Sequence, residues 1–280
     1  MENQKDELKL DVQITDVINK CLLKVHSTYE SAALIYHTLK DFNGDFVPPI
    51  EADSIPIRIT VLDIEPISAK DKAMNWLFQK VFEDFIVGLN ESLIEAYKIV
   101  KYFELGNRSK QESITHEEMH DKIDSINKKS LKMHIPNLIE DIEVGIGKKL
   151  FFRDEILSIN KVRNCLVHRN GKVGLIDTTN DEKSLLELKC IELKIYRDQG
   201  DDMIPVTAED KRKGVQINKM GHKIVSKIML FPVETHVLIE SNVQNAVTFT
   251  CIMFASELLK ALPVNGYTPP DASFDLVTGV

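Results

Sequence analysis

Apolar residues return at helical spacing through much of this chain. In residues 10–40 and 69–104 they recur every three or four positions, which predicts two amphipathic helices. Gly106 follows the second stretch and is expected to end that helix. Between the two helices, residues 57–64 alternate between apolar and polar side chains and predict a short strand.

Further helices are expected in the middle of the chain. Residues 107–130 are highly charged and predict a surface turn followed by a polar helix. Pro136 suits the first turn of the next helix, which continues to Ile146. The apolar positions of residues 153–169 predict another helix, and Asn170-Gly171 supplies the left-handed conformation that commonly follows a helix end.

The pattern changes in the last third of the chain. Residues 185–196 and 223–231 are β-like runs separated by a polar stretch, and residues 241–262 return to helical spacing. The sequence therefore predicts a mainly α fold, a helical bundle with a small antiparallel β element near the C-terminus. We divide the chain into three segments: an N-terminal helix and short strand (1–67), a helical bundle (68–172), and a β-hairpin element with a C-terminal helix packing on the bundle (173–280).

Composition and charge narrow the classes of protein. The 280 residues are 43% hydrophobic and 28% charged, as in a folded chain with a sizeable core. The formal net charge of −8 argues against a protein coated in nucleic acid, although an acidic chain can still contact a few phosphates locally.

Four scattered cysteines without a CxxC pair predict buried, reduced thiols. The start lacks a signal peptide and no apolar stretch is long enough to span a bilayer, so a cytoplasmic location is expected.

One ten-residue segment at positions 162–171 carries the candidate chemistry: Val-Arg-Asn-Cys-Leu-Val-His-Arg-Asn-Gly. Arg163, Asn164 and His168 supply a fixed cation, a neutral amide and a base that titrates near neutral pH, which together can hold or attack a phosphodiester. Asn164 and His168 share one helical face, whereas Arg163 and His168 lie about 140° apart around the helix. Two such helices meeting across a dimer axis would bring the groups into a shared cleft.

The same residues also have a purely structural interpretation. His168 and Arg169 are cations near the carboxyl end of a helix, where the helix dipole favours positive charge. Arg163 would then form a salt bridge. A triplet of this kind is a weak motif on its physical chemistry alone, so this interpretation stays open beside the functional one.

The segment 162–171 resembles the signature of the HEPN superfamily, in which four to six residues separate an arginine from a histidine. Here four residues separate Arg163 from His168, and the polar Asn164 follows the arginine as it does in that family. The predicted order of elements over residues 68–172 also resembles the family: a long helix, a polar stretch, a second helix and then the motif helix.

The resemblance implies a metal-independent endoribonuclease, in many cases a toxin or defence effector, that works as a homodimer with the two motifs facing each other. It implies that His168 deprotonates the ribose 2′-OH or assists protonation of the leaving group, that Arg163 stabilises charge on the phosphate, and that Asn164 positions groups in the cleft. The implied partners are RNA, a second copy of the chain and an antitoxin or regulatory protein, with no cofactor. Other members are non-catalytic, so a HEPN-like module that binds a nucleotide or a protein partner is the alternative.

A second pattern competes with this interpretation, because residues 116–120 read His-Glu-Glu-Met-His and match the HExxH of zinc peptidases. Zinc chemistry there would need His116 and His120 on one helical face and Glu117 as general base. It would also need a third ligand, for which Glu140 is available.

Local sequence weakens the zinc interpretation. Thr115 and Glu118 suit a capping box, which would place His116 in the first helical turn, where the helix dipole disfavours a cation. Charged residues follow the pattern, as on a solvated helix. We interpret HExxH here as a chance match and expect no metal site.

Overall fold

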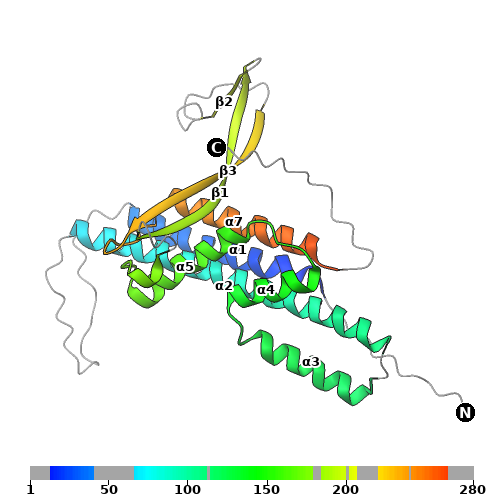
Figure 1. The fold of residues 1–280 in the computed structure, drawn as a ribbon. Helices are drawn as coiled ribbons and strands as arrows, with labels where there is room; N and C mark the ends of the chain where they lie inside the picture. The colour runs from blue at the N-terminus through cyan, green and yellow to red at the C-terminus, as the bar shows by residue number, and fades with distance from the viewer. Residues whose placement is uncertain are drawn as a thin grey trace, which may run out of the picture.

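The structure of the chain, a computed structural model, describes residues 13–40, 66–111, 114–178, 184–199, 202–206, 220–239 and 241–263. Its helices are α1 (Asp16–Lys40), α2 (Pro66–Ser109), α3 (His116–Ser130), α4 (Ile135–Ile146), α5 (Arg153–Arg169) and α7 (Ser241–Ala261), with a 3-10 turn η2 (Leu175–Asp177). Its strands are β1 (Leu185–Gln199), β2 (Asp202–Pro205) and β3 (Met220–Pro232). The predicted mainly α fold with a small antiparallel β element is confirmed (Figure 1). The strand predicted at 57–64 lies outside the described residues.

The carboxyl ends of α4 and α5 follow the local sequence, whereas that of α2 does not. α4 has Pro136 in its first turn and ends where Gly147 takes a left-handed conformation. α5 ends in a similar way, since Asn170 (φ 50°) and Gly171 (φ 77°) are both left-handed, as predicted. The predicted end of α2 at Gly106 is wrong, because this glycine is not left-handed and the helix continues through it for three residues.

The sheet is a long hairpin with a short additional strand. Its order is β2-β1-β3, and both pairings are antiparallel. The two long strands were predicted, whereas β2 was not. On β1, Leu186, Leu188 and Cys190 are buried against the helical core. The other end of the hairpin, with β2, extends beyond the helices (Figure 1).

Helix α2 supplies the centre of the core, and α1, α3, α4, α5 and α7 all contact it. Its buried side chains include Phe82, Phe85, Leu89, Leu93 and Tyr97. One hydrophobic cluster joins residues of the N-terminal segment, the bundle and the C-terminal segment. The three segments therefore share one continuous core.

Two glycines permit close helix crossings against α2. A Cβ atom on Gly88 would lie 2.6 Å from the Cβ of Lys24 on α1, and one on Gly145 of α4 would lie 2.2 Å from Cγ1 of Val100. A larger side chain at either position would push the helices apart, so these glycines help set the positions of α1 and α4.

The four cysteines are free and buried, as predicted. Cys165 lies within the motif segment but on the inner side of α5, where its Sγ donates a hydrogen bond to the carbonyl of Lys172 at 3.5 Å. Burial raises the pKa of this thiol.

In the described part of the chain, none of the helices combines enough length with enough apolar character to cross a membrane.

Candidate functional site: a groove between two helices

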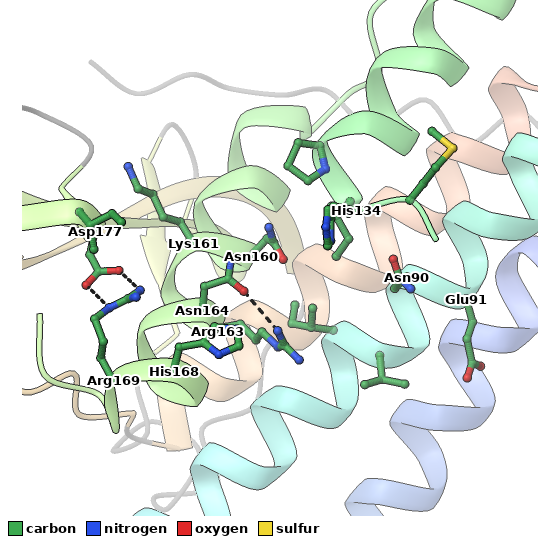
Figure 2. Close-up of a pocket in the computed structure, with 16 residues that line it drawn as sticks. Asn90, Glu91, His134, Asn160, Lys161, Arg163, Asn164, His168, Arg169 and Asp177 are labelled. Carbon is green, nitrogen blue, oxygen red and sulfur yellow. Dashed lines mark hydrogen bonds and ion pairs between the residues drawn. The ribbon is translucent and has the colours of Figure 1, made fainter. Parts of the chain in front are cut away.

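A groove of about 720 Å³ lies between α5 and α2, and the connection from α3 to α4 forms its third side (Figure 2). The α5 wall carries Asn160, Arg163, Asn164 and His168, which include all three motif residues. The α2 wall carries two apolar and two polar side chains: Ile86, Val87, Asn90 and Glu91.

Helical periodicity explains why the motif side chains share this groove. The inner side of α5 buries Ile156, Ile159, Val162, Cys165 and Leu166, which anchor the helix in the core. The polar residues at intermediate positions then face outward, where Arg163 and Asn164 are partly buried and His168 is exposed. A single copy of α5 thus presents the arginine and the histidine to one groove, although they are five residues apart.

Arg163 has unused hydrogen-bonding capacity. Its Nη1 donates to Oδ1 of Asn164 at 3.2 Å, but its buried Nε has no acceptor among the described residues. Arg163 also forms no ion pair with a described residue. The salt bridge that a purely structural role of Arg163 would require is therefore not found among the described residues. Buried donors in proteins are nearly always paired, and an unpaired guanidinium nitrogen beside a groove suits an anionic ligand.

The neighbouring Arg169 forms an ion pair with Asp177. Its Nε donates to Asp177 at 2.6 Å, its Nη2 donates to the other carboxylate oxygen, and the backbone N–H of Gly174 also donates to this carboxylate at 2.9 Å. The hydrogen bonds that Arg169 donates to Asp177 raise the pKa of Arg169. Because Asp177 is 1% exposed, this ion pair fixes η2 against the end of α5.

The groove is locally cationic although the chain is acidic. Lys161, Arg163 and Arg169 line it, against the two carboxylates of Glu91 and Asp177. Arg169 neutralises the second of these carboxylates. Lys161 donates a hydrogen bond to the carbonyl of Thr178 at 2.5 Å. A local excess of positive charge favours a phosphate-bearing ligand despite the net charge of −8.

His134 lines the groove from its third side, the connection between α3 and α4, and the sequence patterns did not indicate it (Figure 2). It is the N-cap residue of α4, yet its side chain makes no capping hydrogen bond and is exposed. The amino end of α4, which carries partial positive charge, therefore also faces this space through Ile135 and Pro136. No local signal could have placed His134 there, because its position depends on how α4 packs.

Glu143 holds the connection between α4 and α5. This buried carboxylate accepts hydrogen bonds from the backbone N–H of Leu150 at 3.0 Å, from Lys149 at 3.0 Å and from Arg153 at 3.2 Å. These contacts fix the start of α5 relative to α4, and thereby the two walls that carry His168 and His134.

The HExxH residues lie elsewhere, on α3. His116, Glu117 and His120 are exposed, and the two imidazole rings are 6.4 Å apart. The predicted capping box is confirmed, since Glu118 accepts from Thr115 N–H at 2.9 Å, and this bond lowers the pKa of Glu118. Within the described ranges, no group of three or more His, Cys, Asp or Glu side chains is placed to hold a metal ion.

Comparisons of the chain with models of protein families, with curated proteins and with solved structures found no significant match.

Proposed function

We propose that this protein is a metal-independent endoribonuclease of the HEPN type, with its reaction centre in the groove between α5 and α2. The observation that carries this proposal is the presence of Arg163, Asn164 and His168 in one groove, together with the Nε of Arg163, which finds no acceptor among the described residues. This set combines a phosphate ligand with a base at neutral pH.

The chemistry follows from the three side chains. His168 takes the proton of a ribose 2′-OH, and the 2′ oxygen attacks the adjacent phosphorus. Arg163 donates hydrogen bonds to the phosphate oxygens, where negative charge grows in the transition state. Asn164 accepts a hydrogen bond from Arg163 and so orients its guanidinium. The products would carry a 2′,3′-cyclic phosphate and a 5′-hydroxyl, and no metal ion takes part.

A second copy of the chain is part of the proposal. Val167 lies within the motif segment and Leu175 and Ile176 follow it, and the three side chains are 38%, 73% and 79% exposed. Exposed apolar side chains grouped at a polar groove favour a protein contact. We place a homodimer contact here, with the two grooves adjacent, so that a regulatory protein such as an antitoxin could block both.

The four free thiols support a reducing, cytoplasmic location.

The test is cleavage of single-stranded and structured RNA by purified protein in the presence of EDTA, with wild type beside His168→Ala. We expect the wild type to cleave and the variant to lose activity while remaining folded. His222→Ala is a matched control, because His222 is exposed on β3 and lies outside the groove. Absence of cleavage by wild type on all RNAs would favour the alternative, a HEPN-like module that binds a nucleotide or a protein partner.

A further inference from the structure

Two histidines face the same groove from different elements. All eight histidines of the chain lie in its described part, and of these only His134 and His168 line this space. His168 belongs to the last turn of α5, and His134 belongs to the connection that precedes α4. Figure 2 shows His134 across the groove from the motif residues of α5.

The side chain of His134 makes no capping hydrogen bond at the helix end where it lies. An N-cap residue usually accepts a hydrogen bond from the first turn, and histidine is not among the residues that do this well. The imidazole of His134 makes no such bond and is exposed to the groove. It is therefore free to exchange protons with a ligand bound there.

Cleavage by a 2′-OH needs two proton transfers. One group must remove the proton from the attacking oxygen, and another must protonate the leaving 5′ oxygen. A single imidazole cannot do both in one step, and arginine stays protonated in proteins. Among the other groups that line the groove, Lys161 and Arg169 are hydrogen-bonded to Thr178 and Asp177, and Glu91 on α2 is the carboxyl group outside the ion pair of Arg169 and Asp177.

We propose that His134 is the general acid of the reaction, a role that rests on the proposed ribonuclease function. The 2′ oxygen forms a bond to phosphorus as His168 accepts its proton, and the bond from phosphorus to the 5′ oxygen breaks as protonated His134 gives that oxygen its proton. Water then returns the two imidazoles to their starting protonation states. Each chain would thus hold both an acid and a base in its own groove.

The experiment compares two substrates in EDTA: an oligoribonucleotide, and uridine 3′-(4-nitrophenyl phosphate), whose leaving group departs without a proton. The variants are His134→Asn, which keeps a good N-cap residue, together with His168→Ala and Glu91→Gln, and His222→Ala is the control. We expect His134→Asn to reduce kcat/KM on RNA by about 10²–10⁴-fold and on the aryl ester by less than about tenfold. The alkaline limb of its pH profile should also disappear, because that limb reports the acid.

Other outcomes overturn the assignment in distinguishable ways. Wild-type kinetics for His134→Asn, equal losses on both substrates, or loss of the alkaline limb in Glu91→Gln would refute the role of His134 and leave the ribonuclease in place. A wild-type protein that cleaves neither substrate would refute the proposed function, and the acid assignment with it.

Discussion

Asp177 and Arg169 form a two-point ion pair directly after the candidate catalytic histidine. Asp177 is 1% exposed, whereas the Arg169 side chain is 30% exposed. The pair joins the last residue of α5 to the last residue of η2, which closes one end of the groove. The cation that the sequence places at the carboxyl end of this helix thus has a specific buried partner.

Asp177→Asn should destabilise the protein. The substitution leaves Arg169 without its counter-ion and removes a strong acceptor from the N–H of Gly174. We expect a loss of about 2–3 kcal/mol in the free energy of unfolding, at the lower end for buried pairs because Arg169 is partly exposed. Urea denaturation measures this, with Arg169→Lys as a milder companion that keeps the charge without the planar fork. A change below about 0.5 kcal/mol for Asp177→Asn would contradict the role assigned to the pair.

Arg163→Gln should separate function from stability. Because neither an acceptor for the Nε of Arg163 nor an ion-pair partner for its guanidinium is found in the part of the chain that the structure describes, the substitution should change the free energy of unfolding by less than about 1 kcal/mol. RNA cleavage should fall by about 10²-fold or more, since the phosphate loses its charged donor. Arg163→Lys should recover part of the activity, because it restores the charge without the two-point geometry. Normal cleavage by Arg163→Gln would contradict the role of Arg163.

Alkaline pH should destabilise the fold through its buried thiols. Burial raises the pKa of Cys21 to about 12 and that of Cys190 to about 11, and it raises that of Cys251 as well. Because the pKa of such a thiol is higher in the folded state, its protonated form stabilises the fold fully at pH values below the ordinary thiol pKa near 9. This contribution to the free energy of unfolding is lost as the pH rises from there toward the pKa of the folded state. Each such thiol should then lower the free energy of unfolding by about 1.4 kcal/mol per pH unit above 9, up to its folded-state pKa.

Cys21→Ala provides the measurement. Between pH 9 and pH 10.5, the stability difference between wild type and Cys21→Ala should shrink by about 2 kcal/mol, because only the wild type loses the contribution of that thiol. Val25→Ala is a buried, non-titrating neighbour on α1 whose effect should not depend on pH. A difference for Cys21→Ala that stays constant over this range would refute the assignment.

Ile176→Asp should abolish the proposed homodimer. The side chain of Ile176 is 79% exposed in the single chain, so a carboxylate there costs little in the monomer but is unfavourable in an apolar contact. Light scattering coupled to size exclusion should give a dimer for wild type and a monomer for the variant. Val144→Asp, at a residue 74% exposed on α4, should remain a dimer. A monomeric wild type would exclude this contact.

Periodicity was sufficient to predict the long elements of the fold. The apolar spacing of α5 and its stop at Asn170 fixed both the helix and its inward face, and the facing of Asn164 and His168 followed from that. Strand β2 was missed because its four residues, Asp-Met-Ile-Pro, are too few to show alternation. The end of α2 was predicted wrongly at Gly106, because the sequence alone does not distinguish a glycine inside a helix from one that ends it.

The groove could be predicted only in part. Arg163, Asn164 and His168 form a local pattern that a sequence can reveal, whereas His134 and Asp177 join them through tertiary packing. The buried Glu143 and the close approach at Gly145 set the position of α4, and neither has a recognisable spacing. The angle of about 140° between Arg163 and His168 around the helix axis suggested a cleft shared by two chains, whereas in the structure a single α5 presents both side chains to one groove.

The most direct test of the central claim uses wild-type protein, EDTA and two oligonucleotides of one sequence, one of unmodified RNA and one fully 2′-O-methylated. The account predicts cleavage of the unmodified RNA alone, with 2′,3′-cyclic phosphate and 5′-hydroxyl ends on the products. Cleavage of both oligonucleotides, or cleavage that stops when EDTA is added, would contradict it.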